Sequence, residues 1–294
     1  MQEIIAKQLL SSKNGINIYR GCSHGCIYCD SRSLCYWQEN PSHIFEDIEA
    51  KINAPELLET ALLSKRQRCM IGTGSMCDSY MQCEKDLKLT RRCLELIDKY
   101  NFGVAIQTKS DLILRDLDLL KSINRKAKCV VEITLTTFDD ELCKIIEPNV
   151  VPTSRRVEVL NIMKNESIPT VVWLTPFLPF INGTVENAQG LMDYCLKANV
   201  HGIILFGAGL TLREGSRDYF YKKLDQSFPG IKQKYISSFG NSYELPCPES
   251  NAIISMIHKT CKSNHILLDN EVFDYMREFP SYRKNSLPNQ PELF

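Results

Sequence analysis

Short apolar runs rich in β-branched residues alternate along this chain with longer runs in which apolar residues recur every three or four positions. The short runs predict buried strands, and the longer runs predict amphipathic helices with one apolar face. Strands are expected over residues 15–20, 68–72, 102–108, 129–135, 168–175 and 201–206. Helices are expected over residues 55–65, 89–100, 112–123, 154–165, 185–198 and 213–228.

This alternation predicts an α/β fold built from parallel βαβ units. Six strands are fewer than the eight of a closed TIM barrel, so on the pattern alone a partial barrel and an open doubly wound sheet fit equally well. The repeat stops near residue 228. We therefore expect an N-terminal segment over 1–14, a core over 15–228 and a C-terminal extension over 229–294 with a helix at 246–261. Reactive side chains should lie in the loops at the C-terminal ends of the strands.

The composition is that of a soluble globular protein, because 44% of the 294 residues are hydrophobic and 24% are charged. The 35 basic and 35 acidic side chains balance, which removes any bulk electrostatic attraction to nucleic acid. A nucleic-acid site would need a local patch, and the basic pairs along the expected helices are more typical of solvated faces. The longest apolar stretch, 168–181, is too short to span a bilayer, so no membrane segment is expected.

Thirteen cysteines are many for this length, and their odd number and irregular spacing do not suggest a disulfide framework. The N-terminal sequence Met1-Gln2-Glu3 does not open a charged region followed by an apolar core, so no secretory signal is expected. Both features favour the reducing cytoplasm as the location. Grouped cysteines there indicate metal binding or catalysis more often than disulfides.

Three cysteines follow the first expected strand at positions i, i+4 and i+7: Cys22, Cys26 and Cys29. Thiolates are the usual ligands of iron–sulfur clusters, and three from one loop can hold three irons of a cubane while the fourth iron keeps an open position. Gly21 and Gly25 allow the backbone to wrap closely around such a cluster. Two alternatives stay open at this point: a zinc site completed by His24 or Cys35, and three incidental buried cysteines.

The spacing C-x3-C-x2-C, with the aromatic Tyr28 before the last cysteine, resembles the signature of the radical S-adenosylmethionine (SAM) superfamily. The wider context at residues 19–29, 51–58, 78–80, 84–85 and 89–91 is similar to the spore photoproduct lyase-like branch, which is often labelled DNA repair photolyase-like. The resemblance extends from about residue 15 to about residue 228. It implies the partial (β/α)6 TIM-type barrel of that superfamily, followed here by a C-terminal helical extension.

The resemblance implies two cofactors, a [4Fe–4S] cluster on the three cysteines and SAM itself. In the superfamily an electron enters through the cluster, the sulfonium C–S bond of SAM breaks, and a 5′-deoxyadenosyl radical abstracts hydrogen from the substrate. A reductant such as flavodoxin or ferredoxin is the implied partner. The substrate is unidentified, because most members of this branch have no established one, and a nucleic-acid base is the candidate that the photolyase-like likeness suggests.

The resemblance also assigns SAM contacts to residues near the strand ends. Tyr28 would lie beside the adenine. A small, polar loop would lie against the methionine moiety: Gly72, Thr73, Gly74 and Ser75. Lys109 and Thr134 match positions near SAM in spore photoproduct lyase, and Arg156 would face the SAM carboxylate. By residue type alone, Lys109 also fits a solvated loop lysine, Thr134 an ordinary strand threonine and Arg156 a helix-face charge.

Cys77 is a candidate hydrogen donor. Spore photoproduct lyase uses a cysteine near this part of its chain to return hydrogen to its product radical, and the alignment puts that position at Ser75. Cys77 could serve instead, because an S–H bond is weak and the loop should face the cavity; a small buried apolar residue is the alternative. Asp30 after Cys29 departs from the tyrosines that flank the cluster in the lyase, which argues against activity on thymine dimers.

Two other functions stay open, a radical SAM maturase of a peptide or protein and a non-catalytic iron–sulfur or zinc binding module. Maturases commonly carry Cys-rich C-terminal extensions with auxiliary clusters, whereas this extension holds only Cys247 and Cys261. The barrel-length α/β pattern behind the cysteine loop argues against a simple binding module. Cys35, beside Tyr36 and Trp37, fits either shielding of the cluster or ordinary packing. We therefore expect a radical SAM enzyme of lyase-like type.

Overall fold

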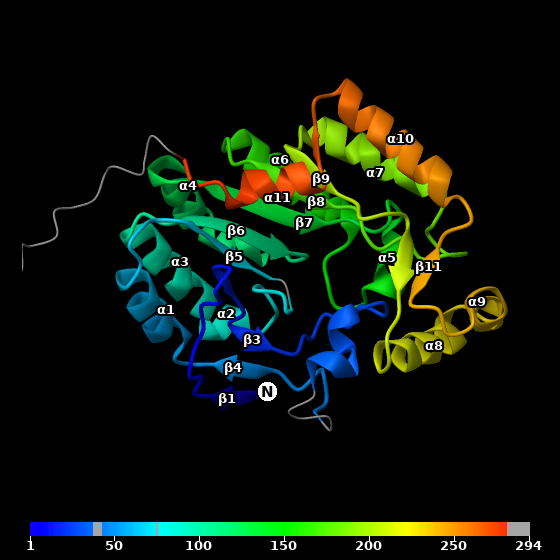
Figure 1. The fold of residues 1–294 in the computed structure, drawn as a ribbon, viewed down its shortest axis with the longest axis horizontal. Coiled ribbons are helices and arrows are strands. Elements are labelled where there is room, and N and C mark those ends of the chain that lie inside the picture. Colours follow the sequence, from blue (N-terminus) through cyan, green and yellow to red (C-terminus); the bar gives the residue numbers. More distant parts are fainter. Residues whose placement is uncertain (38–42, 75, 281–294) are drawn as a thin grey trace, which may run out of the picture.

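A sheet of seven parallel strands forms the centre of the molecule (Figure 1). The computed structural model describes residues 1–37, 43–74 and 76–280. The strand order is β12-β9-β8-β7-β6-β5-β2. The bounds are β2 Gly15–Ile16, β5 Met70–Thr73, β6 Gly103–Thr108, β7 Cys129–Thr134, β8 Thr170–Trp173, β9 Gly202–Ile204 and β12 Leu267–Leu268. Since β2 and β12 remain edges among the described strands, the sheet is open, and the predicted α/β class with a partial TIM-type barrel is confirmed.

Six of these strands overlap the six predicted ones. Every residue of β7 is buried, as expected for a parallel strand that is covered on both faces. The register pairs Ile106 of β6 with Val131 of β7, and Ile133 of β7 with Val172 of β8. The seventh strand, β12, pairs with β9 over two residues only, and a run that short does not stand out in a sequence pattern.

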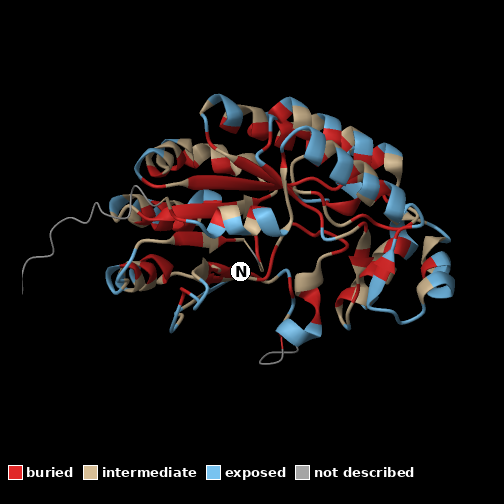
Figure 2. Ribbon diagram, turned by 45° about the horizontal axis from the view of Figure 1, so that its top comes forward, coloured by how far each residue is buried: buried red, intermediate tan, exposed pale blue. Residues whose placement is uncertain are grey.

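Helices cover the outer face of the sheet, and their exposed stripes point away from it (Figure 2). They are α1 Ala54–Leu63, α3 Leu89–Lys99, α4 Leu117–Lys126, α6 Thr153–Asn165, α7 Val185–Ala198 and α10 Ser250–Ser263. Helix α3 shows why they pack this way, because Leu89, Cys93, Leu94 and Ile97 bury one stripe at helical spacing. Helix α1 packs against α3, and α10 packs against α7.

The strand expected over residues 15–20 divides into two. Its first part is β2, whereas Tyr19–Arg20 forms β3 and turns into a second, three-stranded sheet. There β3 pairs antiparallel with β4, Glu49–Lys51, and β4 pairs parallel with β1, Gln2–Ile4. The cysteine loop therefore follows β3 rather than the first strand of the barrel.

Three predicted helices begin later than expected, among them α8, which begins at Ser216 rather than at 213. The first part of the range 112–123 is a 3-10 helix, η3 Asp111–Asp116. The sequence pattern could not reveal this, because three consecutive apolar residues fit a helical period of 3.0 as well as one of 3.6. The helix expected at 246–261 begins at Ser250, since β11, Glu244–Pro246, first pairs with β10, Gly209–Thr211. Shorter helices lie between the main elements: η1 Asp30–Arg32, η2 Leu34–Tyr36, α2 Glu84–Leu87 and α5 Asp140–Ile146.

The chain beyond residue 228 returns to the barrel. After α8, Ser216–Ser227, and α9, Ile231–Phe239, it supplies β11, α10, β12 and finally α11, Asn270–Arg277. Helix α11 packs on the inner face of the sheet, where Val272 and Met276 join Ala105, Val130 and Val171 in one apolar cluster. The division of the chain at residue 228 stays a prediction. Within the described ranges, no helix has the length and apolar character needed to cross a membrane.

Candidate active site

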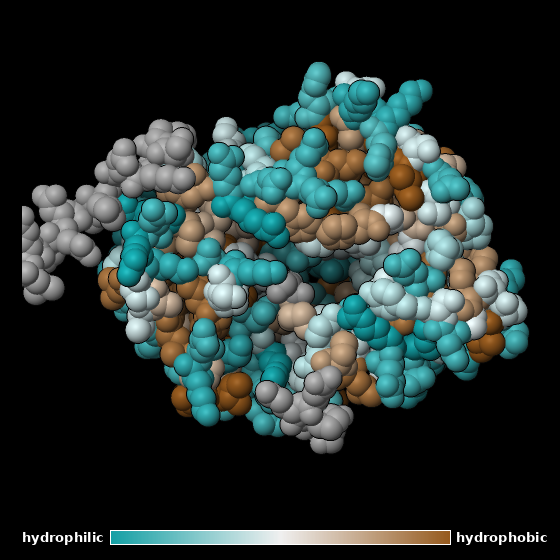
Figure 3. Space-filling model, viewed as in Figure 1, coloured by the Kyte–Doolittle hydropathy of each residue, from teal (hydrophilic) through white to brown (hydrophobic). Residues whose placement is uncertain are grey.

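A cavity of about 460 Å³ opens at the C-terminal ends of the strands and collects the three cysteines of the loop. Cys22, Cys26 and Cys29 line it together with residues at the ends of β5, β6 and β7. The surface is hollowed near the middle of the face that Figure 3 shows. This edge of a parallel barrel is where reactive side chains are expected. The structure thus brings the three predicted ligands to one concave site.

The backbone of the cysteine loop is clamped on both sides. Gly21 has a φ of +78°, and a Cβ there would lie 2.5 Å from the carbonyl oxygen of Phe45, so only glycine fits. The same carbonyl accepts a hydrogen bond from Cys22 N at 3.1 Å. On the other side, Asn149 Nδ2 donates to the carbonyl of Ser23 at 2.8 Å. These contacts restrain the backbone of the loop, and its three cysteines line one cavity.

The donor set suits an iron–sulfur cluster. Burial raises the pKa of Cys22 well above its usual value and that of Cys26 to about 12, although the charge of Lys109 opposes the shift at Cys26. Burial would lower the pKa of Lys109, but Cys26 and Glu147 outweigh it and keep this lysine charged. The thiols must therefore lose their protons when they bind iron. The positive charge of Lys109 beside Cys26 favours this loss, because it stabilises the thiolate.

His24, inside the cysteine loop, is tied to the strand ends through Asp78. His24 Nε2 lies 3.0 Å from Asp78 Oδ2. Asp78 also accepts hydrogen bonds from Thr108 Oγ1 at 2.7 Å and from Lys109 N at 2.8 Å. Burial would raise the pKa of Asp78, but the charge of His24 and the bond from Thr108 hold it below its usual range. An ionised carboxylate therefore couples the loop to the end of β6.

Asp78→Asn should loosen the cysteine loop, because an amide lacks the charge and offers one acceptor where the carboxylate uses both oxygens. We expect the affinity for iron to fall about 10- to 100-fold, the range typical of changes next to metal ligands. Competition with a chelator measures it. Asp118→Asn is the matched control, since this carboxylate is 61% exposed and contacts Arg91 at the surface. Equal iron affinities in the two variants would contradict the coupling.

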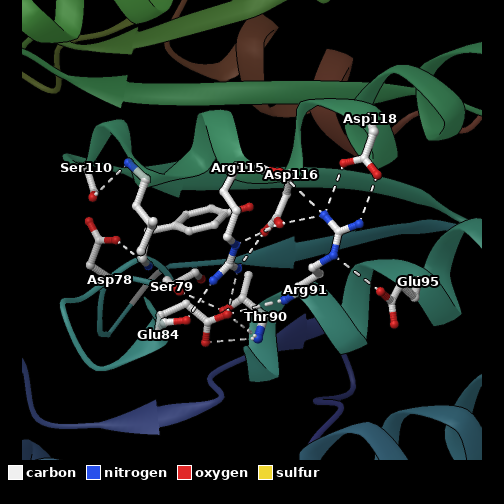
Figure 4. A network of polar contacts seen from close by, with 12 residues as sticks. Asp78, Ser79, Glu84, Thr90, Arg91, Glu95, Ser110, Arg115, Asp116 and Asp118 are labelled. Atoms are coloured by element: carbon white, nitrogen blue, oxygen red, sulfur yellow. Dashed lines mark hydrogen bonds and ion pairs between the residues drawn. The ribbon is translucent and has the colours of Figure 1, made fainter. Parts of the chain in front are cut away.

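A buried polar network supports the segment that follows Asp78 (Figure 4). Arg115 donates to Glu84 at 2.8 Å and to Asp116 at 2.7 Å, and both carboxylates are fully buried. Thr90 Oγ1 donates to the carbonyl of Ser79 at 2.6 Å. Because buried charges persist only when they are paired, these contacts hold residues 78–90 in one conformation between the cavity and α3.

Arg156 meets Tyr28 at a buried carboxylate and does not lie among the residues that line the cavity. Glu147 accepts hydrogen bonds from the Tyr28 hydroxyl and from the Arg156 guanidinium. The guanidinium also donates to the carbonyls of Thr134 and Val151, each at 2.9 Å. The structure therefore does not bring Arg156 onto the first cavity with Lys109 and Thr134, and the residue is not a solvated helix charge either, because it is fully buried.

A second cavity of about 580 Å³ meets the first at Cys29, which lines both. Tyr28, the aromatic residue predicted to lie beside adenine, lines this second cavity. Phe206, Gly207 and Ala208, which follow β9, line it as well. A ligand held at the cysteines therefore has room to extend in two directions.

The other predicted SAM contacts lie on the first cavity, lined by Gly72, Gly74, Lys109 and Thr134. Gly74 has a φ of +89°, and a Cβ there would lie 2.7 Å from the carbonyl oxygen of Gln107. The hydroxyl of Thr134 is buried and has no hydrogen-bond partner within the described part of the chain, which leaves it for a ligand. Ser75 lies outside the described residues.

Sequence reasoning missed one wall of the first cavity. Glu132 and Trp173 line it from β7 and β8, and Phe273, Met276 and Arg277 line it from α11. A signal for Glu132 was present, because a carboxylate stands there in a strand whose other predicted members are apolar or hydroxylated. No comparable signal marked α11, whose place inside the barrel depends on the path of the whole C-terminal segment.

No group of three His, Cys, Asp or Glu side chains is placed to hold a metal ion in the part of the chain that the structure describes, the three loop cysteines included, so the remaining cysteines form no second centre there. Cys35 is exposed, and its sulfur lies 3.8 Å from Arg213. Cys247 is buried and donates to the carbonyl of Phe177 at 3.5 Å.

Comparison with known proteins identifies the family. The model of the radical SAM superfamily matches residues 16–189, more than half of the chain. An uncharacterised protein of Methanocaldococcus jannaschii is 34% identical over 168 residues, which cover 57% of this chain and only 61% of that relative. An uncharacterised protein of Mycobacterium bovis is 26% identical over 236 residues, covering 79% of this chain and 68% of that protein.

Solved structures of spore photoproduct lyase share the fold. The lyase complexed with dinucleoside spore photoproduct has a TM-score of 0.62 at 11% identity, covering 91% of this chain and 80% of that one. A variant with bound AdoMet and the same dinucleoside has a TM-score of 0.56 at 10% identity, covering 86% and 74%. The predicted [4Fe–4S] cluster and SAM are confirmed as the cofactors of the family, and the chain belongs to the radical SAM superfamily.

Proposed function

We propose that this protein is a radical SAM enzyme that abstracts hydrogen from an unidentified substrate. The proposal rests on the convergence of Cys22, Cys26 and Cys29 on one cavity that the ends of β5, β6 and β7 also line. When bound, the cluster and SAM supply the chemistry: one electron from a reductant breaks the C5′–S bond of SAM, which yields methionine and a 5′-deoxyadenosyl radical. The protein positions these groups and keeps water and stray reductants away.

The residues around the cysteines have complementary tasks in this proposal. The three thiolates would hold a cluster that keeps one open position for SAM. Lys109 keeps its charge and offers a cationic partner for a carboxylate, and the unpartnered hydroxyl of Thr134 offers a hydrogen bond. SAM would reach past Cys29 into the second cavity, where Tyr28 and the backbone of Gly207 would lie near its adenosine.

Cys77 remains the proposed hydrogen donor. Its side chain is buried on the first cavity, and its sulfur donates to the carbonyl of Tyr19 at 3.0 Å. Burial raises the pKa of Cys77 to about 12, so the residue stays a thiol at neutral pH. The thiol is the form that can give a hydrogen atom to a product radical. The contact with Tyr19 sets the direction of the S–H bond.

The family and its structural neighbours suggest the substrate class and the partners in this proposal. Spore photoproduct lyase has been solved in complex with dinucleoside spore photoproduct, which makes a nucleic-acid base the leading substrate class in this proposal. The electron donor in this proposal is a flavodoxin or ferredoxin, and the location is the cytoplasm. A maturase acting on a peptide or protein is the alternative substrate assignment, and a non-catalytic iron–sulfur or zinc module is the alternative to catalysis.

Release of 5′-deoxyadenosine tests the proposal. Protein reconstituted with iron and sulfide without oxygen should be brown, and it should release this nucleoside from SAM when dithionite is added. Failure of a fully reconstituted sample to release it would overturn the proposal. About one zinc per chain with no iron or sulfide in native protein would favour the binding module. Copurification with a protein rather than nucleic acid from native cells would favour the maturase.

A further inference from the structure

Glu132 stands out on the inner face of the barrel. Most neighbouring inward positions are apolar, namely Ala105, Val130, Val171 and Ile204, whereas Gln107, which pairs with Glu132 in the register of β6 and β7, also lines the cavity. Glu132 lies two residues before Thr134 on β7, is 5% exposed and lines the cavity that holds the three cysteines. A carboxyl group in apolar surroundings is costly unless hydrogen bonds compensate it, so its partners decide what it can do.

One oxygen of this carboxyl group is already used. The indole Nε1–H of Trp173 donates to Glu132 Oε2 at 2.7 Å. Within the described ranges no other donor reaches the group, so Oε1 stays available on the cavity side. Burial raises the pKa of Glu132 to about 7, which shows how little the surroundings compensate its charge. A hydrogen-bond donor on a bound molecule would complete the site.

The walls beside Glu132 are aromatic. The ring of Trp173 meets the ring of Phe273 from α11 edge to face, with centroids 6.0 Å apart. Phe273 stacks in turn on Phe206, at a centroid distance of 5.5 Å and an interplanar angle of 16°. Helix α11 is anchored by the buried side chains Val272 and Met276, so it holds Phe273 against the sheet. Flat aromatic walls beside a hydrogen-bond acceptor favour a flat ligand with a matching donor.

We propose that Glu132 is a substrate-binding residue whose Oε1 atom accepts a hydrogen bond from an N–H or O–H group on a planar, uncharged ring of the substrate, packed against Trp173 and Phe273. The assignment of the ring to the substrate rests on the proposed function. In this arrangement the cysteines and Thr134 hold the cofactors at one end of the cavity, and Glu132 selects the ring at the other. The C-terminal helix α11 becomes part of the substrate site.

Two small probes test the hydrogen bond directly. The planar cyclic amide 2-pyridone carries an N–H donor, and 1-methyl-2-pyridone has the same ring without that donor. At a pH well above 7, where Glu132 is ionised, we expect the methylated probe to bind reconstituted protein about 10- to 100-fold more weakly, the range for losing a hydrogen bond to a charged acceptor. Ligand-observed NMR titration, without SAM or reductant, gives both dissociation constants. No saturable binding of 2-pyridone, or equal affinities of the two probes, would overturn the proposal.

Glu132→Gln supplies the decisive variant. The amide has one acceptor oxygen, which the indole of Trp173 would hold, so the NH2 group would face the cavity and the preference for the N–H probe should disappear. Glu141→Gln is the matched control on α5, where the side chain is 80% exposed, and it should keep the preference. A preference that persists in E132Q protein with an intact cluster spectrum would overturn the proposal. Release of 5′-deoxyadenosine by the unaltered protein tests the enzyme assignment separately.

Discussion

Cys26→Ala protein should release 5′-deoxyadenosine at less than about one hundredth of the rate of the unaltered protein. Changes beside a metal ligand already cost about 10- to 100-fold, and removing a ligand itself is more severe. The loop offers three thiols to three irons. Among the described residues, Cys77 is the one other cysteine that lines the first cavity, and it cannot readily replace Cys26 because its sulfur donates to the carbonyl of Tyr19. Iron and sulfide content and nucleoside release, both measured after anaerobic reconstitution, check the prediction.

Cys35→Ser is the control for that experiment. Cys35 lies close to the cysteine loop in sequence but is exposed and does not line the cavity. The serine variant should keep its cluster and its rate of nucleoside release. If Cys35→Ser lost the cluster while Cys26→Ala kept it, the assignment of the three ligands would be wrong, and a site completed by Cys35 would take its place.

Glu147→Gln should lower the free energy of unfolding by about 3–5 kcal/mol, because it leaves the buried guanidinium of Arg156 without its counter-charge. Both side chains are fully buried, and the carboxylate also accepts the hydroxyl of Tyr28. Burial would raise the pKa of Glu147, but Arg156 and Lys109 hold it below the usual range, which shows that the ionised pair is the stable form. Denaturant unfolding of the anaerobic protein measures the loss.

The preceding residue on α6, Arg155, provides the matched comparison. Arg155 pairs with Glu158 at 2.6 Å, but the glutamate is 60% exposed, so Glu158→Gln should change stability by only about 0–1 kcal/mol. Replacing both members of the buried pair, in Glu147→Leu with Arg156→Met, should recover most of the loss, since no unpaired charge is then buried. Similar losses for the buried and exposed single variants would contradict the role assigned to the buried pair.

Elements with a strong local pattern were predictable to within a few residues. The helix expected over 185–198 is α7, Val185–Ala198, and the strand expected over 129–135 is β7, Cys129–Thr134. Apolar spacing reports which face of an element is buried, and that information is carried within one run of residues. The same holds for the cysteine loop, because three ligands within eight residues need no distant partner to identify them.

Contacts between distant parts of the chain were not predictable in this way. A sequence pattern showed Arg156 on a helix, but only the folded chain decides that its guanidinium points inward to Glu147 and away from the cavity. The split of residues 15–20 into β2 and β3 likewise depends on β4, which lies about thirty residues further on. Each of these outcomes is set by a partner that local spacing does not reveal.

The cysteine loop and the alternation of strands and helices were therefore readable from the chain alone, and with them the family and its cofactors. The shape of the site was decided by tertiary structure. Asp78 meets His24 across 54 positions of sequence, and α11 brings Phe273 to the barrel interior beside Trp173. The physical reason is that burial and charge pairing depend on which surfaces finally meet, and those surfaces come from segments that share no local pattern.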